Sequence, residues 1–239
     1  MNTIKMFIFF VTSTSVFSQS YSPTTHQGVV VDHRYFSLSY VEEHEQAEWV
    51  YYHLVDTLLK KKVKRVDHFR TDPLVTTGSA ALGDYENSNY DRGHLVPAAD
   101  MVFSEKAMSA SFLLSNVSPQ EPSFNRGIWK KLEALVHSWV VAKKSLHIVT
   151  GPIFQNNKGY IGSNKVTVPG AYYKVIYANE DKKMIGFVLP NQATTLSLQN
   201  FVLSVDAIED LTKIDFFHQL DDAVETVLEA HKIADYKNF

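Results

Sequence analysis

The segment between residues 126 and 142 constrains the fold of this chain more than any other feature. Its apolar side chains recur every three or four residues along one side of a helix: Ile128, Leu132, Leu135, Val136 and Trp139. Runs rich in β-branched and aromatic residues lie on both sides of this segment, separated by Gly, Pro and Asn. An amphipathic helix must bury its apolar stripe against another layer. The sequence therefore predicts an α+β fold with a mixed or antiparallel sheet.

The predicted strands surround this helix. Residues 29–41 fit two early strands, whereas residues 42–62 fit either an amphipathic helix or a strand around Glu48 to Leu54. Four further strands are expected after the helix, at residues 146–150, 166–168, 172–177 and 184–189. Other helices are expected from Ser104, as a cap, to Phe112, and in the segments 206–220 and 222–232. No repeat or linker divides the chain, so residues 19–239 are predicted to form one domain.

Composition narrows the possible functions. The chain of 239 residues has no cysteine, which excludes disulfide frameworks, thiol nucleophiles and cysteine zinc sites. Its formal net charge is −3, so a nucleic-acid partner would have to bind a local basic patch. The sequence contains no GxGxxG, Walker, HExxH or GxSxG pattern, which removes support for nucleotide cofactors, zinc proteases and serine hydrolases.

The first residues are typical of a signal peptide. Lys5 gives a short basic start, an apolar stretch follows, and small residues precede a cut placed after Ser18, with Ser20 as the alternative. We therefore expect residues 1–18 to be removed and the protein to be secreted or periplasmic. A buried N-terminal strand is the competing interpretation. No later run approaches the length of a membrane helix, so no membrane association is expected.

A cluster of reactive side chains lies at Asp91-Arg92-Gly93-His94, after a polar loop spanning residues 71–89. Histidine can take a proton near neutral pH and arginine can bind phosphate with two hydrogen bonds. Taken alone, these four residues also fit a buried histidine beside an ordinary ion pair.

A second cluster lies at the start of the strong helix. At about 100° per residue, Asn125, Trp129 and Glu133 fall on one side. An amide oxygen and a carboxylate are hard ligands that suit a magnesium-like ion or its water molecules. A helix cap beside a solvated glutamate is the alternative.

Together these segments resemble one family, the DNA/RNA non-specific endonucleases, which include endonuclease G and secreted bacterial nucleases. The resemblance covers about residues 35–220 and begins with the family's DRGH signature at Asp91–His94. It continues in order through several further segments: Leu95, Pro97, Ala98 and Ala99; residues 116–120; Asn125, Trp129 and Glu133; residues 150–154; Val168-Pro169 with Tyr173-Lys174; and residues 189–191.

The resemblance implies a ββα-metal site with specific roles. His94 would be the general base, Asn125 the direct Mg²⁺ ligand, and Glu133 would hold metal-bound water. Arg92 would bind phosphate as part of the catalytic machinery. Mn²⁺ is an expected substitute for Mg²⁺, and cleavage leaving 5′-phosphate ends is implied.

Several positions stay open at this stage. The family often has arginine where this chain has His137, which leaves a second phosphate contact undecided. Of Arg65 and Arg70, the sequence favours Arg70 as a catalytic phosphate-binding residue. Asp91, grouped with the substrate-binding residues, fits either a role in orienting the motif or simple pairing with a base.

Three further features can be explained without a catalytic role. His68 and His147 are interpreted as structural. The sequon at Asn116 is not expected to be modified, and the basic run from Lys60 to Arg65 fits either a phosphate-steering patch or a solvated helix end.

These observations predict a secreted, magnesium-dependent endonuclease acting on DNA and RNA. The alternatives are a phosphodiesterase of narrower range and a catalytically silent nucleic-acid-binding module. A homodimer and a protein inhibitor are partners that the sequence allows without deciding.

Overall fold

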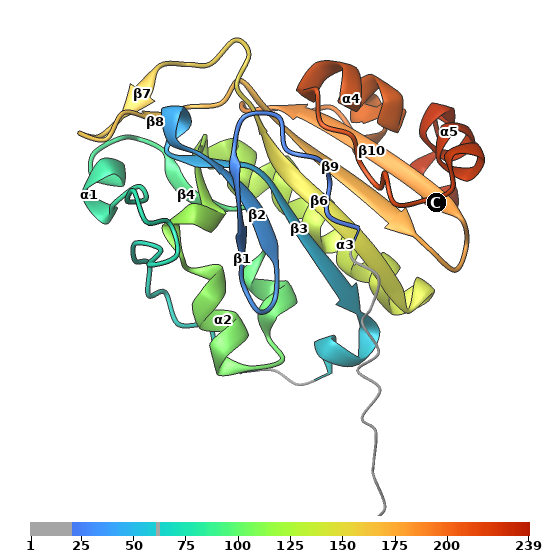
Figure 1. The fold of residues 1–239 in the computed structure, drawn as a ribbon, viewed down its shortest axis with the longest axis horizontal. Coiled ribbons are helices and arrows are strands. Elements are labelled where there is room, and N and C mark those ends of the chain that lie inside the picture. Colours follow the sequence, from blue (N-terminus) through green and yellow to red (C-terminus); the bar gives the residue numbers. More distant parts are fainter. Residues whose placement is uncertain (1–20, 61–62) are drawn as a thin grey trace, which may run out of the picture.

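The computed structural model describes residues 21–60 and 63–239. Its centre is a seven-stranded sheet in the order β1-β2-β3-β6-β9-β10-β11, and every neighbouring pair is antiparallel (Figure 1). Two small two-stranded sheets, β4-β5 and β7-β8, lie outside it. Helices accompany this mainly antiparallel sheet, which confirms the predicted α+β class.

The strands are bounded as follows: β1 Val29–Asp32, β2 Ser37–Val41, β3 Gln46–Val55, β4 Asp91–His94, β5 Val117–Gln120, β6 Ser145–Ile153, β7 Tyr160–Ile161, β8 Val166–Thr167, β9 Ala171–Ala178, β10 Lys183–Pro190 and β11 Val202–Leu203. The α-helices are α1 Leu82–Tyr85, α2 Glu105–Ser111, α3 Lys130–Lys143, α4 Val205–Thr212 and α5 Asp222–Ala230.

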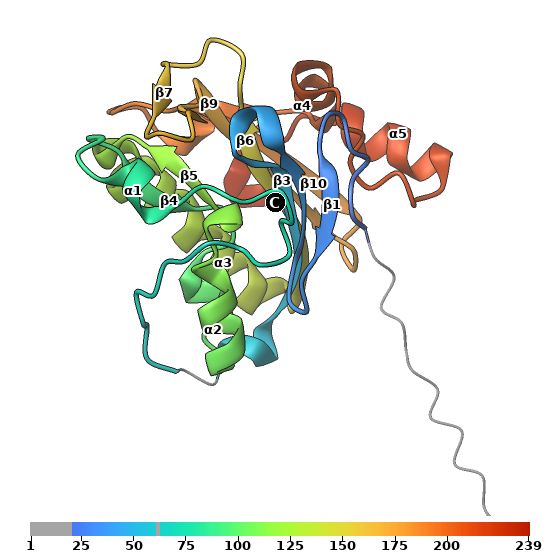
Figure 2. The ribbon, with the colours of Figure 1, turned by 60° about the vertical axis from the view of Figure 1, so that its left-hand side comes forward.

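Successive side chains of a strand point to opposite faces of the sheet, and helices cover both faces of this one. In β9, Tyr172 and Ile176 belong to the core beneath α3, whereas Tyr173 and Tyr177 belong to the core beneath α4. Figure 2 shows the result: α3 and the β4-β5 hairpin lie on one side of the sheet, and α4 and α5 lie on the other. The two faces therefore carry separate sets of functional groups.

Residues 42–62, which the sequence left open between helix and strand, contain the long strand β3. Its side chains are almost all buried because β3 pairs with β2 and β6 in the middle of the sheet. The chain then makes a short 3-10 turn at Asp56–Leu59. Burial on both faces explains why the strand shows no clear alternation of polar and apolar residues.

The strong helix begins later than its apolar pattern predicts. Residues Phe124–Trp129 form a wider, π-helical turn, and α3 starts only at Lys130. The irregularity lies at Gly127, whose φ of −102° and ψ of −105° are not helical. π-Helical turns of this kind are frequent at functional sites.

Of two other predicted helices, one begins as expected and one ends early. Ser104 caps α2 as expected, since its hydroxyl accepts a hydrogen bond from the Ala107 amide (3.0 Å). The predicted helix over residues 206–220, however, ends at Thr212, where Lys213 takes a left-handed conformation with φ of 61°. The chain beyond it turns so that Phe216 and Phe217 enter the core.

The expected signal peptide and its cleavage site lie outside the described residues. Within the described part of the chain, no helix is long and apolar enough to cross a membrane.

Candidate active site

The DRGH residues form β4, and pairing with β5 fixes their position. Gly93 lies opposite Ser118 in this antiparallel hairpin. The buried Ser118 hydroxyl donates to the side-chain oxygen of Gln46 (2.5 Å) and hydrogen bonds the Tyr172 hydroxyl (2.7 Å). Gln46 and Tyr172 belong to the central sheet, so the hairpin is tied to a rigid support.

Close approach of the two strands requires the glycine of the motif. A Cβ at Gly93 would lie 2.2 Å from the side chain of Gln120, which is itself fully buried. Real Cβ atoms essentially never come this close to a non-bonded atom, so a larger residue would have to displace the Gln120 side chain or the strand that carries it.

His94 ends β4 with its ring packed in an aromatic wall. The ring centroid lies 5.3 Å from that of Phe69 and 4.8 Å from that of Phe112. Burial lowers the pKa of His94 to about 3, and the positive charge of Arg65 acts in the same direction. Among the described residues, its buried Nε2 has no hydrogen-bond partner. His94 is therefore a neutral imidazole with one unpartnered, buried nitrogen.

Two guanidinium groups cover this aromatic wall. Arg92 stacks on Phe69 at 4.7 Å, and Arg65 stacks on Phe112 at 5.0 Å. Arg65 also donates to the Asp67 carboxylate (2.6 Å). The stacking holds both positive charges near His94 while leaving them open to solvent.

Asn125 is held by a charged residue of the motif. Its amide nitrogen donates to the Asp91 carboxylate (2.9 Å), which also accepts two hydrogen bonds from Arg126 (2.8 and 2.5 Å). An ionised carboxylate only accepts, so the amide nitrogen must face Asp91. The Asn125 carbonyl oxygen consequently points away from Asp91, where it could bind a cation.

Glu133 projects from α3 toward the same region and interacts with a buried lysine. Lys174 is 1% exposed, and its ammonium lies 5.0 Å from the centre of the Trp129 ring. Burial raises the pKa of Glu133, and the positive charge of Lys174 opposes this rise. Burial lowers the pKa of Lys174, and Glu133 opposes that change. Each charge thus stabilises the other in a poorly solvated environment.

Asp100 extends this network. Its carboxylate accepts a hydrogen bond from the Tyr52 hydroxyl (2.9 Å) and lies 3.3 Å from Nδ1 of His137. His137 is the position where the resembled family often has arginine. The aspartate contact shows that the imidazole takes part in this network beside Glu133.

One cavity of about 690 Å³ collects these groups. Its charged and polar lining residues are Arg65, Arg92, His94, Asp100, Asn125, Arg126, Lys130, Glu133 and His137. A second hollow of about 430 Å³ shares Arg65, Arg92, Asn125 and Arg126 with it. The shared residues make the two hollows adjoin, so together they form a groove suited to an extended anionic ligand.

The donor set fits a hard divalent cation. Asn125 offers a neutral oxygen and Glu133 a carboxylate, and both line the cavity. Few protein ligands would leave such an ion largely hydrated, which is the usual state of Mg²⁺ in proteins.

The whole-chain comparison decides the family. The sequence pattern of the DNA/RNA non-specific endonuclease family matches residues 13–223. The chain belongs to this family. It is therefore a nucleic-acid hydrolase, and the family is one of metal-dependent nucleases.

Named relatives agree with this assignment. The nuclease is 37% identical to Nuclease C1 of Cunninghamella echinulata over 206 residues, covering 78% of this chain and 81% of the relative. It is 32% identical to the human mitochondrial nuclease EXOG over 205 residues, covering 77% of this chain and 56% of EXOG.

A solved structure is similar as well. It is a crystal structure of the EndoG/EndoGI complex, described as showing the mechanism of EndoG inhibition. It matches this chain with a TM-score of 0.75 and 28% sequence identity. The match covers 82% of this nuclease and 88% of that chain.

The structure brings most of the sequence-predicted residues together. Arg92, His94, Asn125 and Glu133 line one cavity, and Asp91 lines the adjoining hollow. Asp91 forms an ion pair with Arg126 and also holds the Asn125 amide, so each of the two interpretations left open by the sequence describes one of its contacts. Trp129, by contrast, is fully buried.

Arg70 does not line this cavity. Its guanidinium donates to the backbone oxygens of Ser109 (2.8 Å) and His68 (3.3 Å). These contacts direct it toward α2, whereas Arg65 lines both hollows. The loop geometry therefore places Arg65 at the cavity, while the preference for Arg70 over Arg65 as the phosphate-binding residue stays a prediction.

Sequence reasoning missed Lys174, Asp100, Arg126 and Lys130 as members of this site. A signal existed for Lys174, because a lysine inside the apolar β9 run is unusual unless it has a buried partner. Arg126, Lys130 and Asp100 have no comparable local signal.

Asn116 and His147, to which the sequence assigned no catalytic role, are buried and hydrogen-bonded within the fold. The Asn116 side chain is fully buried and accepts from the Val96 amide (2.9 Å) while donating to the Val96 and Ser111 carbonyls. No accessible amide remains there for a glycan. His147 is buried, hydrogen bonds the Tyr51 hydroxyl (2.9 Å) and stacks on His53.

Proposed function

We propose that this nuclease is a magnesium-dependent endonuclease that cleaves phosphodiester bonds of DNA and RNA and leaves 5′-phosphate ends. The observation that carries the proposal is the meeting of two groups in one cavity: a buried neutral imidazole with an unpartnered nitrogen, and an amide oxygen aimed by Asp91. Hydrolysis needs a base for water and a site for an electrophile beside it.

His94 is the proposed general base. Its low pKa keeps the ring neutral at physiological pH, so the imidazole can accept a proton from an attacking water molecule. The aromatic wall of Phe69 and Phe112 fixes the ring orientation. A fixed base loses little entropy on reaching the reactive geometry.

Asn125 and Glu133 are the proposed metal-binding residues, Asn125 directly and Glu133 through water. A bound Mg²⁺, or Mn²⁺ in its place, would supply charge neutralisation for the phosphate and for the departing 3′ oxygen. Asp91 orients the Asn125 amide, and Lys174 favours the ionised form of Glu133. Both are positioning residues in this proposal.

Phosphate binding is assigned to the positive side chains of the groove. Arg92 and Arg65 approach from the His94 side, and Arg126 and Lys130 from the helical side. Contacts to phosphate carry no base sequence, which supports cleavage without sequence preference. The charged and small apolar lining agrees with this, and the family description includes both DNA and RNA.

Cleavage of three substrates tests the proposed function. Supercoiled plasmid, single-stranded DNA and an unstructured RNA are incubated with the nuclease in Mg²⁺ and in EDTA. We expect all three to be cut in Mg²⁺ and none in EDTA. Cleavage of one substrate class alone would show a narrower phosphodiesterase, and no cleavage with retained binding would show a silent binding module.

We further propose that the nuclease is secreted or periplasmic, on the basis of its N-terminal residues. The mass of the protein recovered from the periplasm or culture medium tests this, because removal of residues 1–18 gives a defined loss. Retention of the full chain inside the cell would contradict it.

The partners remain proposals too. The similar EndoG structure is titled as an inhibitor complex, which supports a protein inhibitor as a partner class for this nuclease. A homodimer is a prediction that sedimentation of the purified nuclease would test.

A further inference from the structure

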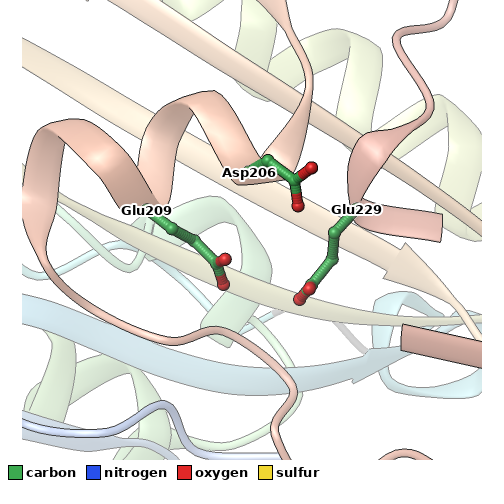
Figure 3. A group of neighbouring side chains, drawn as sticks. All are labelled: Asp206, Glu209 and Glu229. Atoms are coloured by element: carbon green, nitrogen blue, oxygen red, sulfur yellow. The ribbon is translucent and has the colours of Figure 1, made fainter. Parts of the chain in front are cut away.

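A second group of oxygen ligands lies far from the active site, on the opposite side of the sheet. Helices α4 and α5 pack there over Phe216 and Phe217 (Figure 2). Asp206 and Glu209 of α4 meet Glu229 of α5, and one carboxylate oxygen of each lies within 4.8 Å of the others. In Figure 3 the three carboxylates converge on the space between the two helices.

The burial of Glu229 is the observation that turns this cluster into a site. Its side chain is only 6% exposed, although α5 is otherwise mostly solvent-facing. Its Oε1 is buried and has no hydrogen-bond partner among the described residues. Figure 3 shows this carboxylate directed at the other two. A buried, unpartnered carboxylate is costly unless a cation or a proton satisfies it.

The surroundings supply almost nothing to satisfy it. In the described part of the chain, the three carboxylates receive one hydrogen bond, from the Phe216 amide to Glu209 (2.8 Å). Burial and the charges of Glu209, Glu225, Asp215 and Asp206 raise the pKa of Glu229 to about 9. Burial and neighbouring carboxylates raise the pKa of Glu209 to about 7. The charged neighbours that contribute most to these two pKa shifts are all acidic.

We propose that Asp206, Glu209 and Glu229 form a second, non-catalytic divalent-cation site of the calcium type that fastens α5 to α4. Carboxylate oxygens are the ligands that Ca²⁺ prefers. Oxygens on opposite sides of a Ca²⁺ ion stand about 4.8 Å apart, since each bond is about 2.4 Å long. The observed separations fall within this span. Two of the ligands come from α4 and one from α5, so the ion would join the two helices.

Calcium titration calorimetry tests the site. The parent protein in this experiment is the Asn125→Ala variant, which lacks the direct ligand proposed for the active-site metal. Each further substitution is made in this parent, and its Ca²⁺ affinity is compared with that of the parent. We expect about one Ca²⁺ to bind per chain. Glu229→Gln and the more exposed Asp206→Asn should each weaken binding at least about tenfold, because each removes a charged ligand.

Asp210→Asn is the matched control. Asp210 is an exposed carboxylate of the same helix α4 and is not part of the cluster. The variant should bind Ca²⁺ as tightly as its parent. Absence of Ca²⁺ binding in the parent, or equal binding after Glu229→Gln and Asp206→Asn, would overturn the proposal.

Thermal unfolding of the same Asn125→Ala series gives an independent readout. Ca²⁺ should raise the melting temperature of the parent and of Asp210→Asn, but not that of Glu229→Gln, because a ligand stabilises only the state that binds it. If Glu229→Gln raises the melting temperature and Ca²⁺ has no effect on the parent, the cluster holds protons instead. Two Ca²⁺ ions in the Asn125→Ala variant, one lost with Glu229, would contradict the proposed active-site ligand and leave this site standing.

Discussion

Asp91 joins the two halves of the active site, because β4 carries it and its carboxylate holds Asn125 of the following helical turn. We expect Asp91→Ala to raise the Mg²⁺ concentration needed for half-maximal cleavage by about 10-fold or more, as the loss of a group that orients a metal ligand usually does. A magnesium titration of plasmid cleavage measures this. Arg126→Gln removes the ion pair and keeps the Asn125 hydrogen bond, so its magnesium requirement should stay near that of the parent. Equal shifts in both variants would mean that the ion pair, and not the hydrogen bond, is what matters.

Buried histidines make the stability of the fold depend on pH. Burial, and next the neighbouring His53, lower the pKa of His147 to about 3. Its pKa in the unfolded chain is about 6.5. As the pH falls below about 6.5, His147 becomes protonated in the unfolded state but not in the folded state. The free energy of unfolding therefore falls progressively down to about pH 3.

From pH 7 to pH 5, the free energy of unfolding of the parent should fall by about 2 kcal/mol more than that of His147→Gln. Urea unfolding at the two pH values measures this difference. His231→Gln is the comparison, because His231 is exposed. If His147→Gln loses as much stability as the parent on acidification, the histidine is already charged in the folded protein.

At the scale of elements, the β4-β5 hairpin depends on one glycine. We expect Gly93→Ala to destabilise the nuclease by about 1–3 kcal/mol, because the added methyl group overlaps the buried Gln120 side chain. Cleavage should fall as well, since His94 is the next residue. Gly83→Ala in α1 meets no atom within 4 Å and serves as the control, with thermal unfolding as the measurement. A Gly93→Ala variant as stable as the control would show that the Gln120 side chain or its strand can make room for the methyl group at no cost.

The elements differ in how far the sequence predicts them. The apolar stripe of α3 depends on local spacing alone, so its existence could be predicted. The placement of Asn125 and Trp129 could not, because a regular 100° per residue does not describe the π-helical turn around Gly127. Lys174 reaches Glu133 only because β9 packs under α3, a relation fixed by the topology of the sheet.

The two arginines show the same limit for a loop. Arg65 and Arg70 are close in sequence and chemically identical, and only the path of the chain separates them. Backbone hydrogen bonds of Arg70 with Phe112 and Leu114 fix its place in the chain, and its guanidinium donates to Ser109 in α2. Local sequence does not encode these contacts. Motif spacing correctly grouped Arg92, His94, Asn125 and Glu133, because these residues belong to two adjacent elements of the hairpin and helix.

At the scale of the whole molecule, the net charge of −3 means that substrate must be attracted by the groove alone. Four cationic side chains line it, Arg65, Arg92, Arg126 and Lys130. Each phosphate contact adds about 0.9 to the slope of log affinity against log salt, so we expect a slope of about −3 to −4.

Binding of a short duplex to the Asn125→Ala variant in EDTA, across a salt series, measures this slope. Arg65→Ala should reduce its magnitude by about 0.9, the share of one contact. Arg70→Ala should leave it unchanged, because that guanidinium is directed to α2. A reduction with Arg70→Ala alone would return the phosphate contact to Arg70, and a slope near −10 would reveal a wider basic face.

The central claim is that His94 activates water in the cavity it shares with Asn125. Single-turnover cleavage of a defined duplex in saturating Mg²⁺, with the parent and His94→Ala, tests this most directly. The variant removes a general base, so its rate should fall by about 10² to 10⁴-fold while circular dichroism shows an unchanged fold. A folded His94→Ala variant that cleaves at the parental rate would contradict the account.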